Sequence, residues 1–319
     1  MRFEGSPEVL RNLFRKKRLL DAGDVDHCRY RPLILACSGL MRGVYAGGQC
    51  RALDRFGLTK IFDTAVGIST GAPMLGFFLA GQIQQHLDIY WNEAGGDKFV
   101  SFARLWKGGR PVADTDYIAG VFRGKMDQGA IIRSRTKFYA AATCVRSGEG
   151  HLLDVKKVAP DPVEAMHASY AMPKLCGRVV TLDGTEYLDG TVSMSMPIGR
   201  IIEEFRPTDL LVLTNCADEE KDSAFANLLS ALLVHDFPEP FRRSYLSRNK
   251  VFAEETQYLR KQRDCRYAIL WTDKDVGRFE RDPTKLEYAA VRAQAHLANL
   301  LGHAKADVED EQSQLLAAE

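Results

Sequence analysis

The chain has 319 residues, of which 45% are hydrophobic and 27% are charged, and its formal net charge is +1. This composition is typical of a globular protein with one large domain or two small ones, and the near-neutral charge gives no indication of nucleic-acid binding. Seven cysteines are scattered along the chain without a Cys-x-x-Cys pair, so neither a zinc ribbon nor a redox motif is predicted. We therefore expect small core cysteines in a reducing compartment, and no metal or cofactor.

Residues 1–30 are predicted to form a basic N-terminal helical extension. Ser6 and Pro7 can cap and begin a helix that runs through Leu20. Its basic residues are interleaved with apolar ones, and they are Arg11, Arg15, Lys16, Lys17 and Arg18. The segment lacks the uninterrupted apolar core of a secretory signal. Two interpretations remain: a helix packed on its own domain, or one that contacts an anionic membrane surface peripherally.

Residues 31–303 form the predicted main domain, which begins with a strand at 31–36. A turn of mostly small residues, Cys37 to Gly43, follows this strand and leads into a helix at 44–53. Such a turn can hold an anion with its backbone N–H groups, and Arg42 could fix either a phosphate or the loop itself. The turn is not a Gly-x-Gly-x-x-Gly motif and no Walker lysine follows it, so nucleotide binding is not predicted.

The next predicted strand, at 60–66, is followed by Gly67-Ile68-Ser69-Thr70-Gly71 and an apolar helix at 72–80. This is a Gly-x-Ser-x-Gly sequence at a strand-to-helix turn, the context of a nucleophile elbow. A Cβ atom on either flanking glycine would crowd the turn. The helix directs its N–H groups towards the place where an oxyanion would form. The alternative is a tight turn with a capping serine.

Strands and helices continue to alternate along the rest of the domain, which predicts an α/β sheet with helices on both faces. The predicted segments are a helical stretch at 83–126, strands at 135–146 and 151–155, a helix at 162–170, a hairpin at 178–188, a helix ending near 205, a strand at 210–214, a helical stretch at 223–263, a strand at 267–271 and a helix at 286–301. Residues 304–319 are predicted to be a loose, polar, acidic tail. No run of apolar residues is long enough to span a membrane.

Asp189 stands out among the carboxylates. It ends a predicted apolar strand and is followed by Gly190, which puts it at a strand end, where sheets place reactive groups. The competing interpretation is an ordinary Asp-Gly turn. None of the seven histidines stands in an informative motif.

Four of these pieces occur in an order and spacing that resemble patatin-like phospholipases, nearest to bacterial cytoplasmic members. They are the turn ending in Arg42-Gly43, the elbow around Ser69, the segment Ala168-Ser169-Tyr170-Ala171-Met172-Pro173, and Asp189-Gly190. The resemblance covers residues 33–214. It implies a three-layer α/β/α sandwich with a central, mostly parallel sheet. It also implies a lipid acyl-ester substrate and a cytoplasmic location, with contact at the inner membrane surface if the basic helix adsorbs there.

The resemblance further implies a role for each site residue. Ser69 would be the nucleophile and Asp189 the base, without a histidine, with Gly190 supporting the dyad. Ester hydrolysis would proceed through an acyl-enzyme and without a metal. The oxyanion loop would consist of Gly39, Leu40, Met41, Arg42 and Gly43. A carboxylate in water is a weak base for a serine hydroxyl, but desolvation in an apolar cleft would strengthen it.

Three residues depart from the pattern of that family. Ser38 and Leu40 replace glycines of the oxyanion loop, and Thr191 stands where glycine or alanine is usual. If Leu40 needs a positive φ, the leucine costs about 1–2 kcal/mol, although its N–H could still face the oxyanion with the side chain turned away. Two other functions stay open: a Ser-Asp-His hydrolase that uses His235 or His296, and a non-catalytic lipid-binding protein of the same fold.

Overall fold

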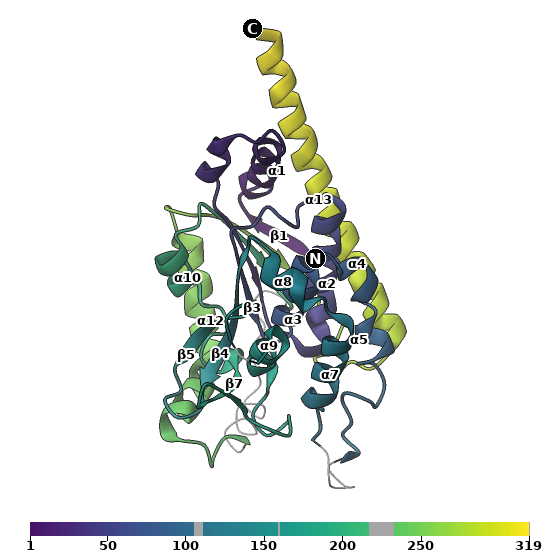
Figure 1. The fold of residues 1–319 in the computed structure, drawn as a ribbon, viewed down its shortest axis with the longest axis vertical. Helices are drawn as coiled ribbons and strands as arrows, with labels where there is room; N and C mark the ends of the chain where they lie inside the picture. The colour runs from purple at the N-terminus through teal and green to yellow at the C-terminus, as the bar shows by residue number, and fades with distance from the viewer. Residues whose placement is uncertain (105–110, 159, 217–232, 319) are drawn as a thin grey trace.

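The computed structural model describes residues 1–104, 111–158, 160–216 and 233–318 (Figure 1). Their strands form one nine-stranded sheet in the order β1-β9-β8-β2-β3-β4-β7-β6, and β5 pairs with β4 outside this path. The strands are β1 (Arg2–Gly5), β2 (Pro32–Ala36), β3 (Thr64–Ile68), β4 (Lys137–Cys144), β5 (Gly150–Asp154), β6 (Val180–Leu182), β7 (Thr185–Asp189), β8 (Asp209–Leu213) and β9 (Arg266–Trp271).

The centre of this sheet is parallel and its margins are antiparallel. Strands β9, β8, β2, β3 and β4 run parallel to one another. The remaining strands pair antiparallel with their neighbours. Strands β2, β3 and β8 are buried at every residue, which fits continuous apolar sequences covered on both faces. The predicted α/β class with a mostly parallel sheet is therefore confirmed.

Helices cover both faces of the sheet, so the three-layer arrangement is also confirmed. The side chains of Ile34 and Ala36 belong to one core cluster, whereas those of Leu33 and Leu35 belong to another. This alternation is the two-residue period of a strand buried on both sides. The first cluster is covered by α1 (Glu8–Asp21), α2 (Gly43–Arg55), α3 (Gly71–Leu79), α4 (Ile83–His86), α5 (Ile89–Asn92), α7 (Thr115–Lys125), α8 (Gln128–Arg133), α9 (Pro162–Tyr170) and α13 (Pro283–Ala318).

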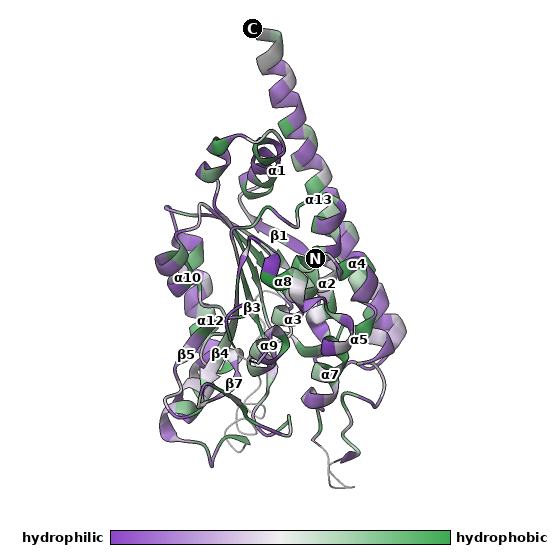
Figure 2. Cartoon of the chain, in the orientation of Figure 1, coloured by the Kyte–Doolittle hydropathy of each residue, from purple (hydrophilic) through white to green (hydrophobic). Residues whose placement is uncertain are grey.

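The second cluster is covered by α10 (Ile198–Phe205) and α12 (Glu239–Lys261). In Figure 2 the central strands are predominantly hydrophobic, whereas α13 carries many hydrophilic residues on its outer turns. Two predicted helical stretches fall partly outside the described residues, the stretch at 83–126 over 105–110 and the stretch at 223–263 over 223–232. No helix in the described parts of the chain is long and apolar enough to cross a membrane.

The first thirty residues pack against the rest of the fold, in agreement with the first of the two interpretations of this segment. Strand β1 pairs with β9, with Arg2 opposite Trp271. Helix α1 buries Leu10 and Leu13 in the core. An edge strand and an apolar helix face are held by tertiary contacts that a local sequence pattern does not reveal. Contact of this helix with an anionic membrane stays a prediction.

The C-terminal residues differ from the prediction, because α13 continues to Ala318 instead of ending in a loose tail. The helix extends beyond the body of the protein in Figure 1, and its distal part runs near α1. Asp307 pairs with Arg11 at 2.6 Å and Glu311 pairs with Arg15 at 2.6 Å. The acidic residues of the expected tail are thus partners for the basic face of α1.

Candidate active site

Ser69 lies at the sharp turn between β3 and α3, as the sequence predicts. Its φ is +53°, a left-handed conformation that is uncommon for residues other than glycine. The flanking glycines are sterically required. A Cβ atom on Gly67 would lie 2.4 Å from the Cα of Ala72, and one on Gly71 would lie 2.1 Å from the carbonyl oxygen of Ala36. The strained turn therefore depends on close backbone packing that only glycine permits.

Strand β4 brings Asp189 to the same place. Ile68, the last residue of β3, pairs with Ala141, and Asp189, the last residue of β7, pairs with Ala142. Ala142 also pairs with β5, so β7 lies on the edge of β4 that faces β3. Two strands of opposite direction thus end opposite consecutive residues of one central strand. This geometry juxtaposes a serine hydroxyl and a carboxylate that are distant in sequence.

The side chains of Ser69 and Asp189 are in direct contact. The Ser69 hydroxyl donates to Asp189 Oδ2 at 2.8 Å. Both residues are buried, with 2% and 1% of their surfaces exposed. Burial raises the pKa of Asp189 to about 6, against the opposing effect of hydrogen bonds from Thr191 and Ser69. A carboxylate with this pKa is a stronger base than one in water and is still ionised at neutral pH.

Helix α9 and the residues just after it hold the backbone of both side chains. The N–H of Ser69 donates to the hydroxyl of Ser169 at 2.9 Å. The N–H of Asp189 donates to the carbonyl of Ala171 at 2.8 Å. The segment that begins at Ala168-Ser169, noted in the sequence, therefore holds the backbone of Ser69 and of Asp189 in place. Position 190 requires glycine, since a Cβ atom there would lie 2.2 Å from the carbonyl oxygen of Ala141.

The predicted oxyanion loop keeps only some of its donors available. The N–H of Met41 donates to the carbonyl of Arg278 at 3.2 Å, and the N–H of Arg42 donates to Gly39. The N–H of Gly43 donates within the same turn. The Met41 N–H, expected from the sequence to face an oxyanion, is thus occupied, whereas the N–H groups of Gly39 and Leu40 have no acceptor among the described residues. The oxyanion role of this loop stays a prediction.

Other members of this loop serve its shape. The Arg42 guanidinium donates through Nε to the carbonyl of Val276 at 2.8 Å, so it fixes the loop. A Cβ atom on Gly43 would lie 1.9 Å from the Tyr90 hydroxyl, so glycine is required there. Leu40 has the positive φ considered in the sequence, at +53°. Leu40 also lines the pocket beside Ser69. The expectation that its side chain turns away from the site is therefore not supported.

Asn215 is a residue of the site that the sequence did not indicate. It is fully buried just after β8, and its Nδ2 donates to the carbonyl of Cys37 at 2.6 Å. Its Oδ1 accepts the N–H of Ala46 in α2 at 3.1 Å. A Cβ atom on Gly39 would lie 2.4 Å from the Cβ of Asn215. Asn215 therefore ties the start of the oxyanion loop to the helix that follows the loop.

Ser69 opens onto a narrow apolar pocket. Its walls are formed by Leu40, Met41, Ser69, Thr70, Pro73, Ile89, Tyr90, Ala94, Phe99, Ile118, Phe122 and Tyr170. The open volume is about 40 Å³, which is room for a few water molecules. Helix α3 starts at this pocket, so its N-terminal dipole favours negative charge beside Ser69. An uncharged, mainly apolar group fits these walls.

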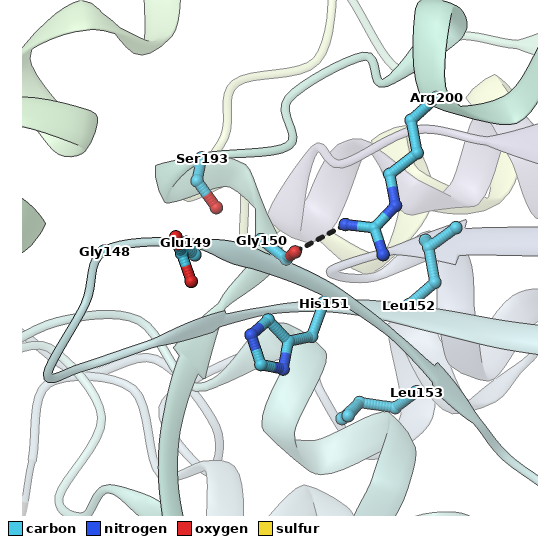
Figure 3. Close-up of a pocket in the computed structure, with 8 residues that line it drawn as sticks. All are labelled: Gly148, Glu149, Gly150, His151, Leu152, Leu153, Ser193 and Arg200. Atoms are coloured by element: carbon cyan, nitrogen blue, oxygen red, sulfur yellow. Dashed lines mark hydrogen bonds between the residues drawn. The ribbon is translucent and has the colours of Figure 1, made fainter. Parts of the chain in front are cut away.

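A larger surface hollow of about 700 Å³ lies elsewhere, along β5 (Figure 3). Arg200 reaches across it and donates to the carbonyl of Gly150 at 2.6 Å. His151, which also lines it, contacts the Tyr187 hydroxyl at 3.1 Å. Neither Ser69 nor Asp189 lines this hollow. The smaller pocket is the candidate site because the strained Ser69 lines it, with the buried Asp189 hydrogen-bonded to Ser69.

The histidines do not reach the dyad within the described residues. No histidine lines the pocket around Ser69. His167 stacks on Tyr170 from α9, and its Nδ1 accepts from the Arg178 guanidinium at 3.2 Å. His296 lies on α13, where burial lowers its pKa and the chain's amino group contributes to the same shift. No group of His, Cys, Asp and Glu side chains suited to a metal ion occurs in the parts of the chain that the structure describes.

Similar proteins are found both by sequence and by structure. A protein of Escherichia coli K12 described as the uncharacterized protein YjjU is 25% identical over 191 residues, which are 57% of this chain and 52% of that protein. The chain thus spans about half the length of this relative. VipD from Legionella pneumophila has a structure similar over 86% of this chain and 67% of its own, at 13% identity and a TM-score of 0.42.

A second sequence match is to a whole family. Residues 37–202, slightly more than half of the chain, match the sequence profile of patatin-like phospholipases. The matched region begins at the oxyanion loop and includes Ser69, Ser169 and Asp189. The chain belongs to the patatin-like phospholipase family.

Proposed function

We propose that the protein is a serine acyl hydrolase that cleaves acyl esters of phospholipids or lysophospholipids. The observation that carries this proposal is the buried hydrogen bond from the Ser69 hydroxyl to Asp189 Oδ2 at 2.8 Å, beside an apolar pocket that Ser69 lines. Membership of the patatin-like phospholipase family supports lipid acyl hydrolysis as the type of reaction.

In the proposed reaction Asp189 is the general base. It takes the hydroxyl proton while Ser69 Oγ attacks the ester carbonyl. The negative charge on the carbonyl oxygen is then met by the N–H groups of Gly39 and Leu40 and by the N-terminus of α3. Collapse of the tetrahedral intermediate releases the alcohol, to which Asp189 returns the proton. A water molecule, activated by the same carboxylate, hydrolyses the acyl-enzyme.

The pocket favours the acyl part of a lipid as the group bound next to Ser69. Its walls are aromatic and aliphatic apart from hydroxyl groups, which suits an uncharged chain better than a sugar or a phosphate. Its open volume of about 40 Å³ is smaller than a lipid acyl chain. We therefore expect the walls around Phe99 and Phe122 to move apart when substrate enters.

One observation favours a second candidate, a lipid-binding protein without turnover. Leu40 keeps a φ of +53°, at a cost of about 1–2 kcal/mol, in the loop that supplies the oxyanion donors. If this strained loop adopted another backbone conformation, its N–H groups would no longer face the oxyanion, and the protein would bind the ester without stabilising the oxyanion. Such a protein would still carry the fold and the apolar pocket.

A fluorophosphonate probe distinguishes the two candidates. The proposed hydrolase should react covalently at Ser69, which mass spectrometry of the labelled peptide would locate, and Ser69→Ala should not react. Wild type and Ser69→Ala should then be compared on a panel of phospholipid, lysophospholipid and soluble short-chain esters. If the folded wild type neither reacts with the probe nor hydrolyses any ester on the panel, the lipid-binding candidate replaces the hydrolase.

A further inference from the structure

Thr191 departs from the family pattern, and its side chain has a specific contact in the structure. Its hydroxyl donates to Asp189 Oδ1 at 2.8 Å, and its backbone N–H donates to the same oxygen at 2.8 Å. The other carboxylate oxygen, Oδ2, accepts from Ser69. Each oxygen of the buried carboxylate thus has its own donors, and one donor would be missing if glycine or alanine followed Gly190.

We infer that Thr191 is a positioning residue of the dyad, whose hydroxyl holds the Asp189 carboxylate with Oδ2 facing Ser69. This inference rests on the proposed hydrolase function, in which Asp189 is the base. The torsion that turns a carboxylate is broad, so a single donor defines its plane poorly. The backbone N–H of Thr191 already binds Oδ1, and the hydroxyl, as a second donor to the same oxygen, restricts that rotation further. Threonine suits the task because its branched side chain is stiff at χ1.

The same hydroxyl also acts on the protonation of the base. Hydrogen bonds to an ionised carboxylate favour the ionised form and lower its pKa. Burial raises the pKa of Asp189 to about 6, and the hydroxyl of Thr191 is one of the groups that oppose this effect. Removing the hydroxyl should therefore raise the pKa further and leave the base protonated over a wider range of pH.

Other titratable groups near Asp189 do not offer an equivalent contact in the described structure. Burial raises the pKa of the Cys176 thiol to about 12, and the Asp189 charge adds to this effect while a hydrogen bond with the Met172 backbone opposes it, so this thiol stays neutral. On the flanking elements, His151 contacts Tyr187, and His167 faces Arg178 and Glu164. The hydroxyl of Thr191 can therefore be tested without interference from a neighbouring charge.

The test compares Thr191→Val, Thr191→Ser and Thr143→Val with wild type. Valine keeps the shape of threonine and the backbone donor but removes the hydroxyl, and serine restores it. Thr143 is the matched control, because its hydroxyl donates to the backbone carbonyl of Asp189 at 3.0 Å and leaves the carboxylate alone. The pH dependence of kcat/KM on a soluble ester and of fluorophosphonate labelling at Ser69 would be measured, with thermal melts for each variant.

We expect the acidic limb of both profiles to move up by about one pH unit in Thr191→Val. It should return to within about 0.3 unit of wild type in Thr191→Ser and stay in place in Thr143→Val. An unchanged limb in Thr191→Val, an equal shift in Thr143→Val, or no recovery with serine would overturn the inference while leaving the hydrolase intact. A wild type without labelling or turnover would instead overturn the proposed function, and this inference with it.

Discussion

Ser69 and Asp189 are 120 residues apart in the chain, yet they share a hydrogen bond of 2.8 Å. They meet because β3 and β7 end opposite consecutive residues of β4, Ala141 and Ala142. The contact is thus set by the central sheet, with α9 holding the backbone of both residues. A dyad built on strand ends is more rigid than one built on loops.

The burial of Asp189 should make its charge costly for stability. Its pKa is raised by burial from 3.8 to about 6, so between these values the folded state binds more protons than the unfolded state. The free energy of unfolding therefore falls as pH rises through this window and the cost persists above it. Two pKa units correspond to about 3 kcal/mol.

Asp189→Asn removes this charge. We expect the variant to be more stable than wild type at pH 8, by up to about 3 kcal/mol, and the advantage to vanish below about pH 4. Chemical denaturation of both proteins across this pH range measures the difference. A variant that is less stable than wild type at pH 8 would show that the ionised carboxylate is better stabilised by its donors than we infer.

Leu40 should tolerate substitutions that keep its N–H. Leu40→Gly relieves a left-handed φ of +53°, so we expect a stability gain of about 1 kcal/mol with activity kept or mildly increased. Leu40→Pro removes the N–H and should cost about 3–4 kcal/mol of transition-state stabilisation. Kinetics on a soluble ester, with a thermal melt for each variant, test both. Full activity in a folded Leu40→Pro variant would exclude this N–H from the oxyanion site.

Asn215→Leu should damage catalysis by loosening the oxyanion loop. The variant loses the hydrogen bonds to Cys37 and Ala46, so we expect kcat to fall about tenfold or more with little change in KM. Affinity for a trifluoromethyl ketone inhibitor, which forms a tetrahedral adduct with the serine hydroxyl, should fall in parallel.

Thr214→Val is the matched control for that experiment. Thr214 is buried beside Asn215, but its hydroxyl binds the carbonyl of Leu270 at 2.8 Å rather than the loop. It should lower the melting temperature and leave kcat within about twofold of wild type. Equal kinetic losses in both variants would mean that Asn215 acts only through overall stability.

Deleting residues 1–22 should unfold or strongly destabilise the protein. The deletion removes β1 from the edge of the sheet and the apolar face of α1 from the core. Activity on anionic vesicles and on a soluble ester should therefore fall together. Arg15→Gln is a milder control, since it breaks the pair with Glu311 without removing apolar contacts. If the deleted protein melts like wild type and loses only its activity on vesicles, the segment is a membrane contact instead.

The sequence predicted what is encoded locally. The elbow around Ser69 is one short segment, and its glycines stand where a Cβ atom would lie within 2.4 Å of the backbone of β2 or α3. Asp189 was identified by its place at a strand end together with its spacing in the family pattern. The structure places Ser69 between a strand and a helix and Asp189 at a strand end, because these elements follow one another directly in the chain. Their catalytic roles stay predictions.

The rest depends on contacts between segments that are far apart in sequence. Asn215 could not be recognised because its role requires β8 to lie next to β2. Strand β1 has few residues of its own and is defined by its partner β9, and the distal turns of α13 are supported by ion pairs with α1. The Met41 N–H likewise donates to the carbonyl of Arg278, which is distant in the sequence, so this contact could not be predicted.

The measurement that tests the dyad most directly is kcat/KM of Asp189→Asn on a soluble ester, beside Ser69→Ala, His235→Ala and His296→Ala. All variants should be folded by thermal melt. We predict that Asp189→Asn and Ser69→Ala each lose about 10³-fold or more, while both histidine variants stay within a few-fold of wild type. Near-normal activity in Asp189→Asn, or a loss in either histidine variant as large as that of Ser69→Ala, would contradict the Ser-Asp mechanism.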